Sequence, residues 1–412
     1  MQEGRGSPKI AVLDTIHGAS TIARELLEQG MDAEALEVYH HTPSITGFEI
    51  VVAPVHLDPR NPALASARSL GKRVVTHHHA VGALLQRQLG QGLKVFEVTG
   101  THSKTSTSLL LSMMLSTRGS VVSHTTRGLE VWSDGRSRLV SRKMSITPGN
   151  VIPAMAEARS RGVDFLVCEV SLGGTGIADW GVLTSLSGDY RIAGGTMWAS
   201  TAKLQLISLA RDGSRVLANT DAQVSPDISF GAGGQVRAEP DRIAFGREEQ
   251  RLSLGGDLDF PAYQIAIAGA AAAARSAGVP LEDVASVLEG FDGLDGRMKL
   301  ERRGDLTILD CSNSGLKVRD VRRALDRISG GRLGVVVGEE SERVCEGMEV
   351  RSLVDLLRQR RDEMALLVLV GERLWPWAEE LRAKRAGDLA SGQQIAAGFG
   401  LDRLLLCVKC FR

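Results

Sequence analysis

Short aliphatic runs alternate along the chain with longer segments whose apolar residues recur at helical spacing. The aliphatic runs are typical of buried strands, and the spacing of Ile22, Leu26 and Leu27 is typical of an amphipathic helix. Strands are predicted at 9–15, 35–41, 48–56, 72–80, 93–100, 163–170, 214–222, 306–313, 332–340, 364–371 and 404–411. Helices are predicted at 16–30, 64–71, 81–90, 103–119, 155–162, 265–279, 281–291, 318–328 and 353–362.

This alternation predicts an α/β protein in which crossover helices connect parallel strands. A chain of 412 residues is long enough for two or three domains. Breaks in the pattern place the boundaries of three α/β units at residues 1–90, 91–292 and 293–412.

Charge and composition narrow the class of protein. The chain has 49 basic and 49 acidic residues, so a general nucleic-acid or membrane-surface binder is not expected. It has no apolar run of the roughly 20 residues that span a bilayer, and its start lacks the apolar core of a signal peptide. We therefore expect a cytoplasmic protein, whose oligomeric state the sequence does not indicate.

The cysteines and histidines are distributed very differently. The five cysteines (Cys168, Cys311, Cys345, Cys407 and Cys410) are odd in number and scattered, which is not the pattern of a disulfide framework. Cys407 and Cys410 form one CxxC pair, consistent either with metal or redox use or with reduced, partly buried thiols. All nine histidines precede residue 125, which indicates a special site in the first third of the chain.

A polar turn joins the predicted strand at 93–100 to the predicted helix at 103–119. It consists of Gly100, Thr101, His102, Ser103, Lys104, Thr105 and Ser106. Such a turn directs backbone N–H groups and the positive end of the helix toward phosphate oxygens. Lys104 would neutralise the phosphates and the Thr105 hydroxyl would bind Mg²⁺. The strict phosphate-loop pattern fails because Val98 and Ser103 replace its two glycines, so an ordinary helix start is the alternative.

A second feature strengthens the nucleotide interpretation. Glu169 ends the aliphatic strand at 163–170, the position from which a carboxylate reaches Mg²⁺ in phosphate-loop enzymes. The motif that reads guanine is missing, which favours ATP. We therefore expect ATP and Mg²⁺ as cofactors, with Thr105 and Glu169 as the metal ligands.

The segment VTGTHSKTST resembles the phosphate loop of the Mur ligase superfamily, and further landmarks follow in the family's order. They are SITPGN at 145–150, Glu169, Gly188-Asp189-Tyr190, Lys203, Asn219-Thr220-Asp221, Gly296-Arg297 and Asp310. The resemblance implies a three-domain architecture, with a central P-loop ATPase domain flanked by two Rossmann-like α/β domains. It makes Lys104, Glu169 and Lys203 the expected catalytic residues, with Lys203 a candidate for carbamylation. Arg297 and Asp310 are expected to contact the nucleotide.

Three departures from the superfamily pattern stand out. Ser103 occupies the position of a loop glycine, which narrows the space over the β-phosphate. Tyr190 replaces a histidine that often binds a second metal ion, and Tyr263-Gln264 replaces a His-Asn pair that meets adenine. The resemblance therefore does not assign a second Mg²⁺ site or the adenine contacts to these positions.

Segments outside the central domain, among them AVLDTIHG, VVTHHHAVG, VGEESERVCEG and CVKCFR, resemble the coenzyme F(430) synthase branch of methanogenic archaea. The resemblance implies a nickel tetrapyrrole substrate. ATP would convert one of its propionates to an acyl phosphate, and a carbon of the same macrocycle would close the last ring. The attacking carbon must lose a proton. Either the reduced macrocycle activates this carbon, or one of the clustered histidines acts as the general base. Candidate donors to the substrate carboxylates are His77, His78, His79, Arg127 and Arg297.

Two other functions compete with this interpretation. One is an amide-forming Mur-type ligase for a cell-wall precursor or a polyglutamate, which would need an added amine. The other is a nucleotide-switch protein for metal handling, which would hydrolyse ATP slowly and bind a partner protein. The acyl-phosphate landmarks disfavour the second, and the histidine-rich first third of the chain disfavours the first.

Overall fold

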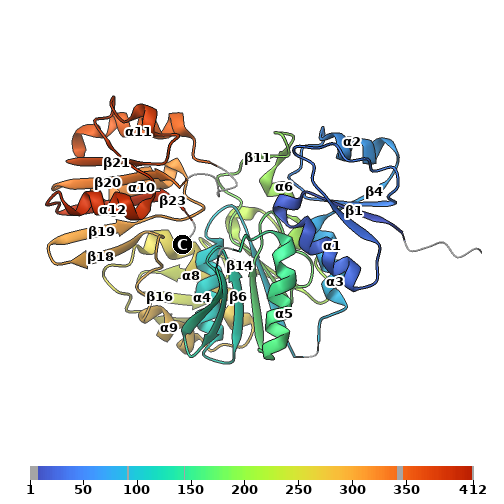
Figure 1. Ribbon diagram of the computed structural model, residues 1–412. Coiled ribbons are helices and arrows are strands. Elements are labelled where there is room, and N and C mark those ends of the chain that lie inside the picture. Colours follow the sequence, from blue (N-terminus) through green and yellow to red (C-terminus); the bar gives the residue numbers. More distant parts are fainter. Residues whose placement is uncertain (1–7, 91, 143, 341–346, 411–412) are drawn as a thin grey trace, which may run out of the picture. The chain divides into compact units, whose positions relative to one another are not determined.

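The computed structural model describes residues 8–90, 92–142, 144–340 and 347–410. The chain divides into two compact units, one of residues up to 252 with 264–288 and one of residues 253–263 with those from 289 onward. Figure 1 shows their strands and helices. Cys345 lies outside the described residues, as does most of the segment VGEESERVCEG.

A four-stranded sheet begins the first unit, with parallel strands in the order β2-β1-β3-β4. After β1 the chain forms β2 on one side of it, and then crosses to form β3 on its other side. The direction of strand order therefore reverses between β1 and β3. Open α/β sheets bind ligands outside the carboxyl ends of the strands at such a point. The strands are β1 (Ile10–Leu13), β2 (Ala33–Leu36), β3 (Ile50–Ala53) and β4 (Arg73–Thr76). The helices are η1 (Thr15–His17), α1 (Ala19–Glu28), α2 (Pro62–Ser69) and α3 (His77–Gln86).

The predicted strand at 72–80 is wrong in its second half, because β4 ends at Thr76 and α3 begins at His77. The β-branched residues before His77 favour a strand. Thr76 ends it by acting as an N-cap, its Oγ1 accepting the N–H of His79 at 3.2 Å. The three consecutive histidines therefore form the first turn of a helix.

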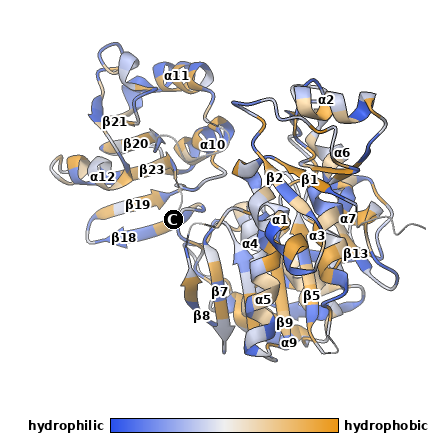
Figure 2. Ribbon diagram, turned by 45° about the vertical axis from the view of Figure 1, so that its right-hand side comes forward, coloured by the Kyte–Doolittle hydropathy of each residue, from blue (hydrophilic) through white to orange (hydrophobic). Residues whose placement is uncertain are grey.

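An eleven-stranded sheet forms most of the rest of this unit, in the order β17-β16-β15-β14-β13-β10-β5-β9-β6-β7-β8. Strands β15, β14, β13, β10, β5, β9 and β6 run parallel, and antiparallel strands extend both edges. Hydrophobic residues dominate its central strands β5 and β9 (Figure 2).

The strands of this sheet are β5 (Lys94–Thr99), β6 (Val121–Thr125), β7 (Gly128–Ser133), β8 (Arg136–Ser141), β9 (Phe165–Glu169), β10 (Trp180–Leu183), β13 (Arg215–Asn219), β14 (Ile228–Phe230), β15 (Val236–Glu239), β16 (Arg242–Phe245) and β17 (Glu248–Arg251). A separate ribbon pairs β11 (Arg191–Ile192) with β12 (Met197–Trp198). The accompanying helices are α4 (Lys104–Leu115), η2 (Pro148–Asn150), α5 (Val151–Arg161), α6 (Ala199–Lys203), α7 (Gln205–Ser208), η3 (Thr220–Ala222), α8 (Phe260–Ser276) and α9 (Leu281–Glu289).

The two sheets of the first unit share one hydrophobic core. Ile22 of α1, Val81 and Leu85 of α3 and Met155 of α5 belong to the same buried cluster. Gly82 allows the close approach of α3, since a Cβ there would lie 2.0 Å from the backbone oxygen of Thr175. The predicted boundary near residue 90 therefore separates two sheets that pack against each other.

The second unit contains a six-stranded sheet in the order β18-β19-β23-β20-β21-β22, in which only the pair β18 and β19 is antiparallel among the described strands. Its strands are β18 (Lys299–Arg303), β19 (Leu306–Asp310), β20 (Leu333–Glu339), β21 (Leu366–Val370), β22 (Lys384–Ala386) and β23 (Arg403–Lys409). Its helices are α10 (Val318–Ile328), α11 (Val350–Gln359), η4 (Arg361–Glu363), η5 (Trp375–Trp377) and α12 (Leu389–Ala397). Helix α10 buries Val321, Ala324, Leu325 and Ile328, which recur at helical spacing on one face.

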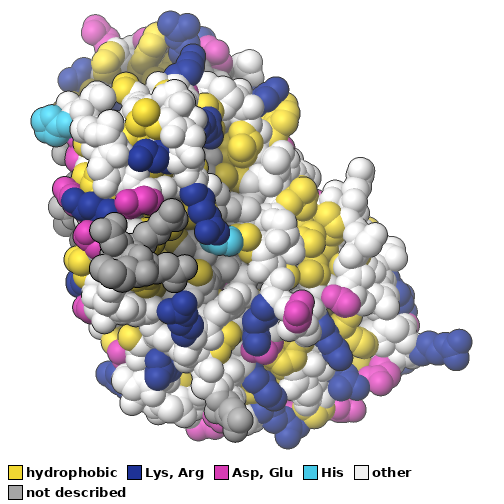
Figure 3. Space-filling model, turned by 90° about the vertical axis from the view of Figure 1, so that its right-hand side faces the viewer, with side chains coloured by type: hydrophobic (Ala, Val, Ile, Leu, Met, Phe, Trp, Pro, Cys, Tyr) yellow, Lys and Arg dark blue, Asp and Glu magenta, His cyan; other side chains and the backbone are white. Residues whose placement is uncertain are grey.

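The balance of basic and acidic residues is also visible on the surface (Figure 3). Basic and acidic side chains both occur on the face drawn in Figure 3, with neither sign alone covering it. Across the described residues, we find no helix with the length and apolar character that crossing a bilayer requires.

Candidate functional site

The predicted phosphate loop lies between β5 and α4, as its sequence indicated. Gly100 adopts φ 148°, and a Cβ at this position would lie 2.1 Å from Thr184 Oγ1, so only glycine fits. Ser103, where the superfamily has glycine, takes a left-handed conformation with φ 64° immediately before the helix. A non-glycine residue is thus held in a conformation that costs about 1–2 kcal/mol.

Contacts to the turn after β10 hold the first part of the loop. The Thr101 hydroxyl donates to the Ser187 carbonyl at 2.7 Å, and His102 Nε2 lies 2.9 Å from the Ser187 hydroxyl oxygen. Lys104 Nζ donates to the Gly100 carbonyl at 3.2 Å, so the lysine side chain folds back over the loop. The buried Ser106 follows in the first turn of α4.

Thr105 and Glu169, the two predicted metal ligands, are in direct contact. The Thr105 hydroxyl donates to Glu169 Oε2 at 2.7 Å, and the N–H of Thr126 lies 3.3 Å from the same oxygen. Both side chains are buried, and β5 and β9 are paired so that Val98 lies opposite Glu169. A hydroxyl and a carboxylate are the hard oxygen donors that Mg²⁺ prefers, so this pair fits the expected ion.

Lys203 is buried at the end of the short helix α6. Its Nζ lies 5.3 Å from the centre of the Tyr190 ring. Asp189 accepts the backbone N–H groups of Tyr190 and Ser200, both at 2.9 Å, and fixes the start of α6. Burial alone would raise the pKa of Asp189, but these hydrogen bonds and the charge of Lys203 hold it below its usual value.

The three predicted substrate histidines differ in their surroundings. His77 and His78 are buried, and their Nε2 atoms lie 2.9 Å and 2.7 Å from the carbonyl oxygens of Leu13 and Ser171. Burial lowers the pKa of His77 to about 3 and that of His78 to about 4, so both rings are neutral at pH 7. His79 is exposed, and of the three it is the side chain that faces solvent.

Arg127 lies in the turn between β6 and β7. It forms an ion pair with the buried Glu130 at 3.1 Å, and its own side chain is 40% exposed. It therefore remains accessible to a carboxylate from solvent, the role that the sequence analysis predicts for it.

Arg297 and Asp310 both belong to the second unit. Asp310 is buried at the end of β19 and accepts the N–H of Ser312 at 2.9 Å. The carbonyl of Arg297 accepts a short hydrogen bond from the Tyr263 hydroxyl. The Tyr263 hydroxyl is thus bound within the second unit.

The described cysteines do not form a disulfide among themselves. Cys407 and Cys410 are both buried, and Cys407 lies beside Cys311. Burial raises the pKa of the Cys407 thiol well above its usual value, which disfavours the reactive thiolate. Of the two interpretations of the CxxC pair, this environment favours reduced, buried thiols.

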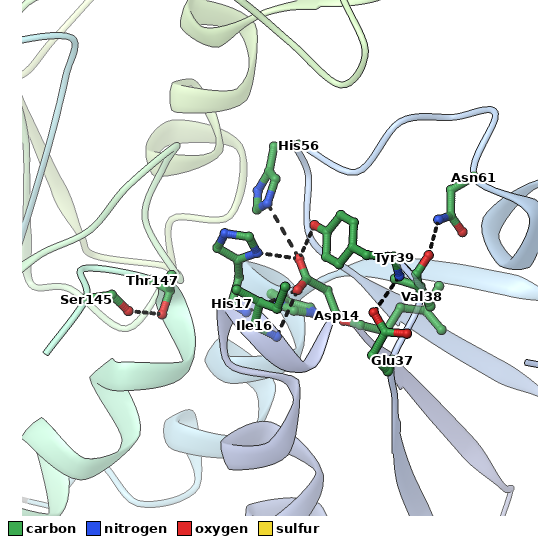
Figure 4. A network of polar contacts seen from close by, with 12 residues as sticks. Asp14, Ile16, His17, Glu37, Val38, Tyr39, His56, Asn61, Ser145 and Thr147 are labelled. Atoms are coloured by element: carbon green, nitrogen blue, oxygen red, sulfur yellow. Dashed lines mark hydrogen bonds and ion pairs between the residues drawn. The ribbon is translucent and has the colours of Figure 1, made fainter. Parts of the chain in front are cut away.

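A group of side chains that the sequence analysis did not single out lies at the carboxyl ends of β1 and β3 (Figure 4). Asp14 directly follows β1, His17 ends η1, and His56 follows β3. The Asp14 carboxylate accepts hydrogen bonds from His17 Nδ1 at 2.7 Å and from the Tyr39 hydroxyl at 2.8 Å. Burial would raise the pKa of Asp14, but the hydrogen bonds from His17 and Tyr39, together with His56 Nε2 at 3.6 Å from the carboxylate, hold it well below its usual value. The histidine-rich first third was the sequence signal for this group.

Comparisons with known proteins agree with this fold. Residues 300–410 match the family model described as "Coenzyme F430 synthetase CfbE, C-terminal domain". MurF from Acinetobacter baumannii aligns with a TM-score of 0.59 at 17% identity, over 82% of this chain and 78% of that one. A bifunctional folylpolyglutamate synthase/dihydrofolate synthase solved with Mn, AMPPNP and L-glutamate bound aligns with a TM-score of 0.57 at 16% identity, over 80% and 90%. These structures confirm the Mur-ligase-like α/β architecture.

Sequence identity extends over the full chain in one relative. The protein named "Coenzyme F(430) synthetase" from Methanosarcina acetivorans is 36% identical over 468 residues, covering 98% of this chain and 99% of that protein. The chain therefore belongs to the coenzyme F(430) synthetase family.

Proposed function

We propose that this protein is an ATP-dependent ligase that closes the final carbocyclic ring of a nickel tetrapyrrole to give coenzyme F(430). The observation that carries the proposal is the 36% identity, over nearly the whole of both chains, to a protein named for this synthesis. The phosphate loop and the Thr105–Glu169 pair support it, because they provide what phosphoryl transfer from ATP requires.

The proposed site residues have different roles in phosphoryl transfer. The N–H groups at the start of α4 bind phosphate oxygens, and Lys104 neutralises the charge that builds on the transferred group. Thr105 and Glu169 hold Mg²⁺, which supplies further charge neutralisation when bound. Arg297 and Asp310 contribute contacts to the nucleotide.

The reaction forms one carbon–carbon bond. A propionate oxygen takes the γ-phosphoryl group, and ADP leaves. A macrocycle carbon then attacks the acyl carbon, loses its proton, and displaces phosphate, so that a ring ketone remains. Both reacting ends belong to one substrate, and the protein's main task is to position them. Of the four residues predicted to contact the substrate, His77 and His78 are buried against backbone carbonyls. His79 and Arg127 are exposed and remain the proposed donors to its carboxylates.

The test of this function is an assay without any amine. The purified protein, ATP, Mg²⁺ and the open-ring nickel tetrapyrrole should yield ADP, phosphate and a product lighter than the substrate by one water molecule. Mass spectrometry identifies the product. Turnover that needs an added amino acid would instead establish an amide-forming ligase, and release of AMP with pyrophosphate would exclude the acyl-phosphate route.

Glu169→Gln should lower the rate of ADP formation by about 100-fold and raise the Mg²⁺ concentration needed for half-maximal rate. The amide keeps the size of the side chain but removes the charge that makes it a strong Mg²⁺ ligand. A Mg²⁺ titration of the steady-state rate measures both effects. Glu157→Gln is the matched control, since Glu157 forms an ion pair with Arg161 on the outside of α5. An unchanged Mg²⁺ dependence in Glu169→Gln would remove Glu169 from the metal site.

Lys203→Ala should be strongly impaired, and short carboxylates such as formate or acetate should partly restore its activity. This follows if the buried lysine carries a carbamate, because an added carboxylate then replaces the missing acidic group. Rates measured with and without the added acid test the expectation. If Lys203→Ala is impaired and added carboxylates do not raise its rate, Lys203 acts as an ammonium group without a carbamate.

A further inference from the structure

The group formed by Asp14, His17 and His56 occupies the place where sheets of this type bind ligands. Asp14 and His17 follow β1, His56 follows β3, and the strand order reverses between these two neighbouring strands. Asp14 and His56, which are 42 residues apart in sequence, are therefore brought together at the carboxyl ends of neighbouring strands. The roles proposed for the phosphate loop do not use any of the three side chains.

The distances between the three side chains suit a metal ion. One ligand atom from each residue lies within 4.8 Å of the other two. His17 Nδ1 is 2.7 Å and His56 Nε2 is 3.6 Å from Asp14 Oδ2, and the two imidazole rings are nearly perpendicular, with centres 4.7 Å apart. Metal–nitrogen and metal–oxygen bonds of about 2.0–2.2 Å place neighbouring ligand atoms at comparable separations.

The backbone holds the carboxylate in place for this role. Asp14 adopts a left-handed conformation with φ 80°. Its Oδ1 accepts the N–H groups of Ile16 and His17, both at 3.1 Å, which leaves Oδ2 directed toward the two rings (Figure 4). The Tyr39 hydroxyl donates to Oδ2 at 2.8 Å, as neighbouring groups commonly orient a ligating carboxylate.

Two further observations favour an ion at this position. His56 Nε2 is buried and has no hydrogen-bond partner among the described residues, although it faces the carboxylate. The carboxylate itself is fully buried, whereas the side chains of His17 and His56 are 19% and 27% exposed. An ion could therefore enter from the histidine side and satisfy the buried nitrogen.

We propose that Asp14, His17 and His56 bind one hydrated divalent transition-metal ion, of the zinc, nickel and cobalt class. Two imidazoles and one carboxylate are donors that such ions prefer, whereas Mg²⁺ and Ca²⁺ prefer oxygen alone. The three donors occupy three positions of the ion and leave the others for water or for a carboxylate ligand. A nickel already held by a macrocycle offers a single axial position on each face, so it cannot accept all three.

The experiment uses the full chain, treated with a chelator and then titrated with Zn²⁺, Ni²⁺ or Co²⁺ in the absence of nucleotide. Elemental analysis gives the bound metal per chain, and the visible absorption of Co²⁺ reports the ligand environment. We expect one ion per chain. His17→Gln and His56→Gln should each weaken binding by about 100-fold, and Tyr39→Phe by about 10-fold.

The control is the double variant His40→Gln/His41→Gln, because both side chains are exposed and nearby in sequence. It should bind the ion as tightly as the wild type. Glu169→Gln should do so as well, which separates this site from the Mg²⁺ site of the proposed function. Thermal unfolding without metal checks that each variant folds.

Three results would overturn the proposal. The first is a wild-type protein that binds none of the three ions. The second is a His56→Gln variant that binds them as tightly as the wild type does. The third is a protein without affinity for the free ions whose affinity for the nickel tetrapyrrole falls in His56→Gln, which would make His56 a ligand of the substrate instead.

Discussion

Lys104→Ala is expected to reduce ADP formation by about 1000-fold and to weaken ATP binding. Lys104 is the cation at the start of α4, and its Nζ reaches back over the loop to the Gly100 carbonyl. Removing it leaves the negative charge of the transferred phosphoryl group without its mobile counter-charge. Steady-state rates and nucleotide titration measure the two effects.

The control for this variant lies on the same strand. Lys94 begins β5 at the end opposite the loop, is exposed, and stacks over the Phe165 ring. Lys94→Ala should keep normal turnover. If Lys104→Ala also kept it, the segment between β5 and α4 would not be a phosphate-binding loop.

The first unit should lose stability steeply as the pH falls below about 6.5. Burial lowers the pKa of His77 to about 3 and the pKa values of His78 and His124 to about 4, from an ordinary value near 6.5. Between these values the unfolded chain binds more protons than the folded one, so acid favours unfolding. Each ring then costs about 2 kcal/mol at about pH 5, or about 6 kcal/mol together. Thermal unfolding followed from pH 8 to pH 4.5 measures the loss.

His124→Gln should shift this acid transition to lower pH. His124 Nε2 lies 3.1 Å from the Ser145 carbonyl, a contact that the amide of glutamine can replace without gaining a proton. The exposed pair His40 and His41 supplies the control, and the double glutamine variant should retain the wild-type transition. A protein equally stable at pH 7.5 and pH 5 would contradict the assignment of buried, neutral rings.

The parts of the fold that the sequence predicted correctly are those with strong apolar patterns. The aliphatic runs that become β5, β9 and β20 are buried along nearly their whole length. The hairpin strands β8 and β17 are polar and largely exposed, so their sequences carry no such pattern. The start of α3 was missed because a single hydroxyl, that of Thr76, outweighs the strand preference of the residues before it.

The candidate site divides in the same way. The sequence could assign Thr105 and Glu169 to one metal site. Thr105 lies in the recognisable loop that follows one aliphatic strand, and Glu169 ends another. The sequence could not bring Asp14 and His56 together in this way. Their proximity depends on the pairing of β1 with β3, and the residues of a strand do not reveal which strands lie beside it. The concentration of histidines indicated the region but not the partners.

The packing of α3 bears on where the chain can be cut. A fragment that ended at residue 90 would expose Val81 and Leu85, which the core of the first unit otherwise buries. It would also leave Gly82 without the backbone of Thr175 against which it fits. The N-terminal sheet is therefore a poor candidate for expression as an isolated fragment, and truncation studies of ligand binding should keep both sheets of the first unit on one polypeptide.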